Sequence, residues 1–164
     1  MVTIVQRVLT ASVRVDGEVV GEIGPGLLAL VAVTRTDGPE QIAWTARKLT
    51  GLRIFRNGDK HFDLDVAQSG GSILLVSNFT VAAATRQGRR PSFDNAADPD
   101  TGRKLFDELI EAVRATGVPV ATGRFGADMK VELVNDGPAT FILNSGDAEN
   151  TNALSPQTGT DGHR

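Results

Sequence analysis

The stretch VTIVQRVLTASVRVDGEVVGEIGPGLLALVAV, residues 2–33, determines the fold class. Residues 2–9 and 12–15 are rich in β-branched side chains, which favour strands, and Asp16-Gly17 between them and residues 19–23 is typical of a two-residue hairpin turn. Residues 27–33, LLALVAV, are apolar throughout, as in a strand buried on both faces. A short buried helix is the alternative, but the bounding glycines and proline favour a strand. The chain therefore opens as a β-hairpin followed by a buried strand.

Two amphipathic helices are predicted farther along. In the first, Asp37 is the expected N-cap with Glu40 as its capping-box partner, and Gly51 ends the helix. The second begins at residues 98–100 and ends before Gly117. Apolar residues at helical spacing define the inward faces, namely Ile42, Ala46 and Leu49 in the first helix and Leu105, Phe106, Leu109, Ile110 and Val113 in the second.

The remaining strands complete one α+β domain over residues 1–143. They are expected at residues 52–55, 72–78, 130–134 and 139–143. Asp136-Gly137-Pro138 lies between the last two and fits a turn, because proline cannot donate to a sheet ladder. Residues 144–164 are rich in Ser, Gly, Asp, Asn and Thr and are predicted to form a disordered tail. The fold class is a curled, barrel-like, antiparallel-rich β-sheet with two main helices packed on it.

Composition excludes several classes of protein. The 164 residues include no cysteine, so disulfides and thiolate zinc sites are excluded. No apolar run approaches the length of about 20 residues that a membrane span needs, and no signal peptide is visible. We therefore expect a cytoplasmic protein without a membrane partner. A net charge of −3 means that a nucleic-acid partner must be held by a local patch or by shape.

The segment HFDLD, residues 61–65, is the one candidate for a metal site. His61, Asp63 and Asp65 alternate, so on a strand their side chains would share one face. The interpretation we prefer is a solvated strand face with Phe62, Leu64 and Val66 pointing inward. No second cluster of ligands supports the site, and we predict neither a metal nor a cofactor.

Two polar segments follow the strand at residues 72–78. Ser77 and Thr80 lie at its end, where sites often form, but the internal histidine His61 has no evident link to them. These side chains fit equally well as hydrogen-bond partners for the backbone at a strand end. The segment TRQGRRPSF, residues 85–93, carries three arginines around a glycine, which suits either phosphate binding or a solvated basic loop.

Four segments taken together resemble the D-aminoacyl-tRNA deacylase family, over essentially residues 1–143. They are VSNFTVAAATRQGRRPSF, GRFGADM, VELVNDGPATF and the spacing of LRIF. Each is weak alone, and their joint presence in this order is specific. The resemblance implies a homodimer without metal or cofactor that hydrolyses the ester between a D-amino acid, or mischarged glycine, and the 3′ adenosine of tRNA.

The resemblance also implies a site. The family's SQFT motif corresponds to Ser77, Asn78, Phe79 and Thr80, and its Gly-cis-Pro motif to Gly137-Pro138, which reaches into the partner subunit's active site. Held rigidly, that motif would reject an L side chain and admit a D-amino acid or glycine. The matched positions make Arg7 a brace for the Gly-Pro segment and Phe125 and Met129 contacts of the adenosine, though each fits a structural role as well.

The mechanism stays open between two routes. Backbone amides of Phe79 and Thr80 are candidates to stabilise the oxyanion. The Thr80 hydroxyl is a candidate nucleophile, but no base is evident, so assistance by the 2′-hydroxyl of the RNA is favoured. Asn78 stands where the family typically has glutamine and Ala139 where it has valine. Because of this shorter amide, a second functional hypothesis remains, a module that binds RNA ends or D-amino acids without turnover. The third hypothesis is a metal hydrolase that uses His61, Asp63 and Asp65.

Overall fold

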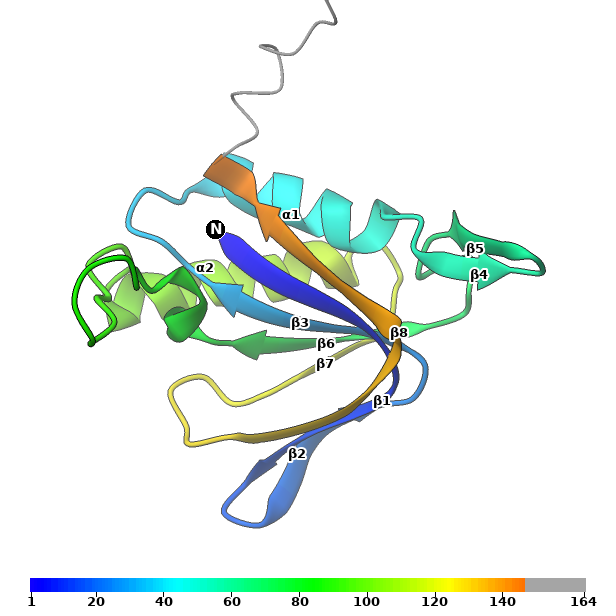
Figure 1. Cartoon of the computed structure of the whole chain (residues 1–164), viewed down its shortest axis with the longest axis horizontal. Helices are drawn as coiled ribbons and strands as arrows, with labels where there is room; N and C mark the ends of the chain where they lie inside the picture. The colour runs from blue at the N-terminus through cyan, green and yellow to red at the C-terminus, as the bar shows by residue number, and fades with distance from the viewer. Residues whose placement is uncertain (147–164) are drawn as a thin grey trace, which may run out of the picture.

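The computed structural model describes residues 1–146, which form a curled mixed sheet, a small hairpin and two main helices (Figure 1). The sheet contains β1 (Val2–Val15), β2 (Glu18–Ile23), β3 (Gly26–Ala32), β6 (Ser72–Ser77), β7 (Val120–Thr122) and β8 (Lys130–Asn144). The hairpin is formed by β4 (Phe55–Asn57) and β5 (Lys60–Leu64). The helices are α1 (Pro39–Gly51), the 3-10 helix η1 (Phe79–Ala82) and α2 (Pro99–Arg114).

The first strand organises the sheet. The strand order is β2-β1-β3-β6-β7, and β8 pairs with β1 as well. The first half of β1 lies between β3 and β8, and its second half lies between β8 and β2. A strand that changes neighbours along its length curls the sheet into an almost closed barrel. The β3–β6 and β6–β7 pairs are parallel and the other pairs of the sheet are antiparallel, so the predicted antiparallel-rich, barrel-like α+β fold is confirmed.

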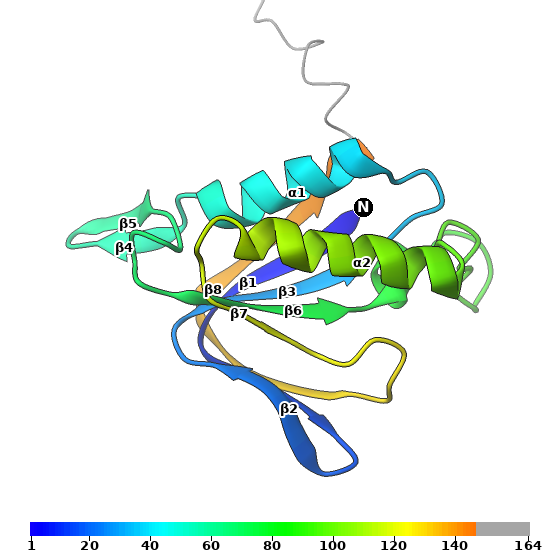
Figure 2. The ribbon, with the colours of Figure 1, turned by 180° about the vertical axis from the view of Figure 1, so that it is seen from behind.

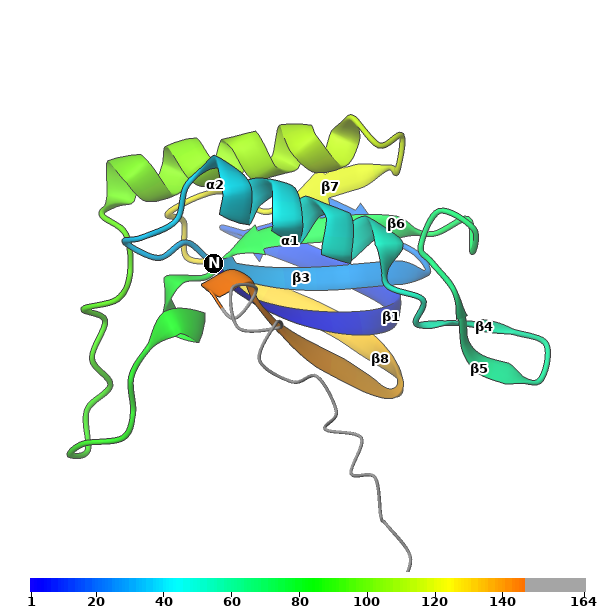
Figure 3. The same ribbon diagram turned by 90° about the horizontal axis from the view of Figure 1, so that it is seen from above.

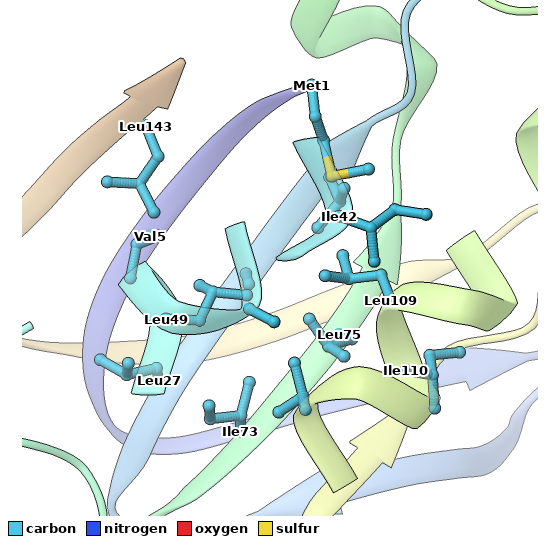
Figure 4. Close-up of a cluster of buried hydrophobic side chains, with 14 of the residues drawn as sticks. Met1, Val5, Leu27, Ile42, Leu49, Ile73, Leu75, Leu109, Ile110 and Leu143 are labelled. Atoms are coloured by element: carbon cyan, nitrogen blue, oxygen red, sulfur yellow. The ribbon is translucent and has the colours of Figure 1, made fainter. Parts of the chain in front are cut away.

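The curled sheet has two apolar cores, one on each face. Both helices cover one face, as Figures 2 and 3 show from behind and from above. Leu27, Ala29 and Val31 point toward this helical side, while Leu28 points into the barrel, so LLALVAV is buried on both faces as predicted. The larger core joins residues from α1, α2, four strands of the sheet and Phe55 of the small hairpin. Figure 4 labels Ile42, Leu49, Leu109, Val5, Ile73 and Leu143 among them.

The two helix starts differ in how well the sequence predicted them. Asp98 caps α2 by accepting a hydrogen bond from the Thr101 amide at 3.0 Å, as expected. The predicted Asp37–Glu40 cap of α1 is wrong. Gly38 is the N-cap residue, and its amide donates to Gln41 Oε1 at 2.8 Å. The Asp37 carboxylate is engaged elsewhere, because it accepts from the Thr34 amide at 2.6 Å and pairs with the buried ammonium of Met1.

The predicted hairpin at Asp136-Gly137-Pro138 is also wrong. Residues 130–135 and 140–144 both belong to β8, and both pair with β1. Asn135 lies opposite Val8 and Thr140 opposite Gln6, so residues 136–139 bulge from the ladder opposite Arg7 alone. The Asn135 side chain bridges this bulge, donating to the Ala139 carbonyl at 3.1 Å and accepting from the Ala139 amide at 2.9 Å.

Two predicted boundaries shift. The short strand expected over residues 52–55 begins only at Phe55, in β4. At the other end β8 reaches Asn144, and the buried Ser145 donates its amide to the Met1 carbonyl at 3.0 Å. The last strand therefore extends one residue past its predicted end at residue 143. Residues 147–164 of the predicted tail, including His163, lie outside the described residues.

Candidate functional site

A cavity of about 750 Å³ opens where the parallel strands β3 and β6 end. Its floor is the apolar barrel core, with Leu28 and Leu30 from β3 and Val76 from β6. Val131 and Leu133 of β8 form one wall, and the start of α2 forms another. Mostly apolar walls with a few polar groups at strand ends are typical of a ligand site.

Ser77, Asn78 and Phe79 line this cavity, as the sequence predicts for a strand-end site. Ser77 is the last residue of β6, and Asn78 extends the ladder by donating its amide to the Val31 carbonyl at 2.8 Å. Asn78 then caps η1, because its side-chain oxygen accepts from the Thr80 amide at 3.2 Å and from the Thr80 hydroxyl at 2.5 Å. Among residues 1–146, the Phe79 amide has no hydrogen-bond acceptor.

Thr80 does not line the cavity. Its hydroxyl donates to an amide oxygen, which cannot take up a proton as a base would. The carboxylates that do line the cavity belong to Asp98 and Asp128, and both have partners already. Asp98 caps α2, where the Thr101 backbone N–H holds the pKa of its carboxyl below the usual 3.8, and Asp128 pairs with Lys130 at 3.0 Å.

Phe125 and Met129 both line the cavity, so the structure brings them together with Ser77, Asn78 and Phe79. The guanidinium of Arg103 lies 4.7 Å from the centre of the Phe125 ring. Two glycines lie next to these side chains. A Cβ on Gly102 would lie 3.5 Å from the Phe125 ring, and a Cβ on Gly123 would lie 2.7 Å from the Met129 sulfur.

Arg7, Gly137 and Pro138 lie elsewhere, at the other end of the sheet. The guanidinium of Arg7 is buried, with 3% of the residue exposed, and it donates to the carbonyls of Asp136 at 2.9 Å and Ile54 at 2.6 Å. It also pairs with the Asp136 carboxylate at 3.4 Å. Gly137 and Pro138 are exposed, and the peptide bond between them is cis. Arg7 therefore contacts the residue that precedes Gly137-Pro138, and its role as a brace stays a prediction.

The register gives the separation of these two groups. Arg7 is opposite Leu27 at the start of β3, whereas Ser77 is opposite Val31 at its end. Four residues of strand separate the two levels, which is roughly 13 Å at 3.3 Å per residue. The level of Arg7 and the Gly137-Pro138 bulge is therefore offset along the strands from the level of Ser77.

The HFDLD segment forms no metal site within the part of the chain that the structure describes. Asp63 instead bonds Asn57 and Arg53, each at 2.7 Å, and the Asn57 hydrogen bond, with the Lys60 and Arg53 charges, keeps the pKa of Asp63 below its usual value. The expectation that Phe62 points inward is wrong. It is 58% exposed and lies beside Arg7, 5.7 Å from the guanidinium. Of the helices in residues 1–146, none has the length and apolar content needed to cross a membrane.

Sequence reasoning missed the wall formed by residues 96–99, Gly102 and Leu133. Gly102 carried no clear signal, because a Cβ there would make only an ordinary contact of 3.5 Å with the Phe125 ring, so close packing does not require a glycine. Leu133 carried none, since its alternation in β8 indicates only that it faces the barrel. Asn135 was missed too, because its bond across the bulge depends on the non-hairpin course of β8.

Comparisons with known proteins agree on one family. The family model described as D-Tyr-tRNA(Tyr) deacylase matches residues 4–144. The D-aminoacyl-tRNA deacylase of Methylococcus capsulatus is 57% identical over 143 residues, which are 87% of this chain and 94% of that protein. The protein of the same name from Geobacter sulfurreducens is 52% identical over 88% of this chain and 95% of its own length.

Two solved structures share the fold. One, titled as a c-Myc DNA unwinding element binding protein, superposes with a TM-score of 0.83 at 33% identity and covers 88% of this chain and 98% of its own. The other, titled as a probable eukaryotic D-amino acid tRNA deacylase, has a TM-score of 0.72 at 18% identity and covers 87% and 97%. The second similarity concerns the fold alone. The family match over residues 4–144, with relatives above 50% identity, shows that this chain belongs to the D-Tyr-tRNA(Tyr) deacylase family.

Proposed function

We propose that this protein hydrolyses the ester between a D-amino acid and the 3′ adenosine of tRNA. Two observations together support this proposal. The chain belongs to the deacylase family, and one cavity at a strand end is lined by Ser77, Asn78, Phe79, Phe125 and Met129. In the reaction, water adds to the ester carbonyl, the bond to the 3′ oxygen breaks, and that oxygen leaves with a proton. The products are a free D-amino acid and uncharged tRNA.

The Phe79 amide is the proposed stabiliser of the oxyanion that forms on the ester carbonyl. Phe79 lines the cavity, and its N–H has no acceptor among residues 1–146. A backbone donor fixed by a capped turn needs no reorganisation during the reaction. The Thr80 amide is the weaker candidate, because it already donates to Asn78. Thr80 acts through Asn78 in this scheme and fixes the turn.

The 2′-hydroxyl of the terminal adenosine is the proposed assistant of the attacking water. The carboxylates lining the cavity are committed to other bonds, and the Thr80 hydroxyl is directed at an amide oxygen. A hydroxyl on the substrate itself lies next to the ester in every aminoacyl-tRNA. This route therefore needs no protein base.

A second copy of the chain is proposed to complete the site with its Gly137-Pro138 bulge. Three features support this arrangement: the bulge is exposed, it is pinned by Arg7 and Asn135, and it lies roughly 13 Å along the strands from the level of Ser77. A homodimer would bring each bulge to the partner's cavity. There it would exclude an L side chain and admit a D-amino acid or glycine.

The test is single-turnover deacylation of matched D- and L-aminoacyl-tRNA, and of glycyl-tRNA, with a chelator present. The wild type is expected to cleave the D-ester and the glycyl ester and to spare the L-ester. In Gly137→Ala an added Cβ would lie 2.2 Å from the Ala139 nitrogen, so the bulge must move, and L-ester cleavage should rise roughly ten-fold or more. Gly24→Ala is the matched control, because nothing lies within 4 Å of a Cβ there.

Binding without turnover of any ester would instead favour the non-catalytic module. Loss of activity on chelation would favour a metal hydrolase. Unchanged discrimination in Gly137→Ala would remove the bulge from the selection step, while leaving the hydrolase assignment intact.

A further inference from the structure

A pinned loop, residues 83–97, projects between η1 and α2 beyond the ends of β3 and β6, and Figure 3 shows it standing away from the body. Its base is tied at several points. Ala84 and Ser92 exchange two backbone hydrogen bonds of 2.8 Å, and the Ala97 amide donates to the Val33 carbonyl at 3.0 Å. The Arg35 amide donates to the Asn95 carbonyl at 3.0 Å. These ties fix the loop against the strand end that holds the cavity.

The loop carries a local positive charge that is not neutralised by carboxylates within residues 1–146. Arg86, Arg89 and Arg90 are all exposed, and residues 84–93 contain no carboxylate. None of the three forms an ion pair with a carboxylate among residues 1–146, whereas Arg53, Lys130 and several other surface cations do. Three unpaired guanidinium groups on a tied loop of an acidic protein suit an external anion.

An exposed aromatic pair joins this loop to the cavity. The rings of Phe79 and Phe93 meet edge to face, with centroids 5.1 Å apart. Phe79 lines the cavity and is 56% exposed, and Phe93 is 41% exposed at the end of the arginine segment. Exposed aromatic rings beside unpaired arginines are the combination that binds a single-stranded nucleic acid, where bases stack and phosphates pair.

We infer that residues 84–93 form a docking surface for the RNA strand whose 3′ end enters the cavity. Arg86, Arg89 and Arg90 bind its phosphates, and a base of the unpaired end stacks on Phe93. The inference deepens the proposed function and rests on it for the identity of the RNA. It explains how a chain with a net charge of −3 holds a polyanion.

The test uses uncharged tRNA, so that binding is measured apart from turnover. Fluorescence anisotropy gives the Kd of the wild type and of Arg86→Gln/Arg89→Gln/Arg90→Gln at salt concentrations of about 50 to 200 mM. Loss of three phosphate contacts should lower the slope of log Kd against log salt by about 2–3, and should weaken binding roughly 100-fold near 0.1 M salt. The corresponding triple lysine variant should keep most of the slope, because the charge is retained.

A control separates local contacts from net charge. Arg47→Gln/Lys48→Gln/Lys60→Gln removes the same three charges from α1 and the β4–β5 hairpin, outside the cavity lining. It should keep the wild-type slope. Phe93→Ala should weaken binding roughly ten-fold with the slope unchanged, because stacking releases no counterions, and Phe93→Tyr should restore it.

The outcomes separate this inference from the proposed function. Equal slopes in the wild type and the loop variant, an equal fall in the control, or no tRNA binding by the wild type would overturn the inference. Loop-dependent tRNA binding by a wild type that cleaves no ester would uphold the inference and defeat the proposed function. An unchanged urea midpoint shows that the loop variant is folded, as expected for exposed side chains.

Discussion

The two ends of the parallel strand pair β3–β6 are built in opposite ways. At the end where β3 and β6 finish, a cavity of about 750 Å³ has mostly apolar walls, and Ser77 and Asn78 stand at its edge. At the end where they start, the buried Arg7 and the side chain of Asn135 tie down an exposed bulge with hydrogen bonds. The first end is hollow and suited to receive a ligand. The second is solid and suited to present a fixed surface.

This difference predicts different costs of substitution at the two ends. Changes at the Arg7 end should lower the free energy of unfolding, because polar bonds are lost there. Substitutions at the cavity should lower activity more than the free energy of unfolding, because the side chains there border empty space and make fewer contacts to lose. Each variant below is therefore assayed for both urea unfolding and single-turnover deacylation.

The largest effect is expected for Arg7→Ala. Its removal leaves the Asp136 and Ile54 carbonyls without their donor and the Asp136 carboxylate without its closest cation, which should cost about 3 kcal/mol of unfolding free energy. Arg7→Lys should recover only part, since an ammonium cannot reproduce the fork geometry. Arg14→Ala is the control, because its pair with Glu132 is exposed and 3.9 Å long. Comparable losses for Arg7 and Arg14 would contradict the contrast between the ends.

Gly102→Leu is expected to act mainly on activity. A Cβ at this position lies 3.5 Å from the Phe125 ring, so a leucine side chain would occupy part of the cavity that we propose for the substrate. Deacylation should fall roughly 100-fold, as displacement of a substrate by about 1 Å can cause. A normal rate in a folded Gly102→Leu protein would show that the substrate lies elsewhere.

Gly102→Ala should raise the free energy of unfolding slightly, in contrast to the other variants above. Its Cβ makes only an ordinary van der Waals contact, and alanine is favoured over glycine within a helix such as α2 by about 0.5–1 kcal/mol. The urea midpoint should therefore rise, while deacylation falls less than in the leucine variant. A lower midpoint would indicate that Phe125 cannot accommodate even one methyl group.

The smallest effect concerns pH and the carboxylate at the cavity edge. The Thr101 amide lowers the pKa of Asp98 in the folded protein, so the Asp98 carboxylate stabilises the fold above the unfolded value of 3.8. That contribution is lost as the pH falls through the lower folded pKa. In Asp98→Asn the decline of the urea midpoint below pH 4 should be shallower than in the wild type. Parallel declines would mean that the cap does not contribute through its charge.

How far the sequence predicted the fold depended on whether a signal was local. The buried strand LLALVAV, the inward faces of both helices and the Asp98 cap follow from short-range patterns, and all are confirmed. The Asp37 cap failed because the ammonium of Met1 competes for that carboxylate from a distant part of the chain. The hairpin at Gly137-Pro138 failed for the same reason, since both flanks of the bulge pair with β1.

The site followed the same rule. Ser77 and Asn78 could be expected at a strand end, and resemblance to a family added Phe125 and Met129, which do line the cavity. The walls from Leu133 and Gly102 could not be expected, because they depend on how β8 and α2 approach β6. The roles of Thr80, Arg7 and Gly137-Pro138 in selection and catalysis remain predictions for the experiments above.

The position of β1 has a consequence for synthesis of the protein. A ribosome makes β1 first, yet one of its neighbours, β8, is the last strand of the sheet. Pairing between such distant segments closes a long loop, and domains rich in such contacts fold slowly. The emerging chain therefore carries an open edge on β1 until residues 130–144 leave the exit tunnel, a state open to aggregation or chaperone capture. The bulge at residues 136–139 and the cavity wall at Val131 and Leu133 form only at that last step. The sheet and the cavity are therefore completed together, by the same strand.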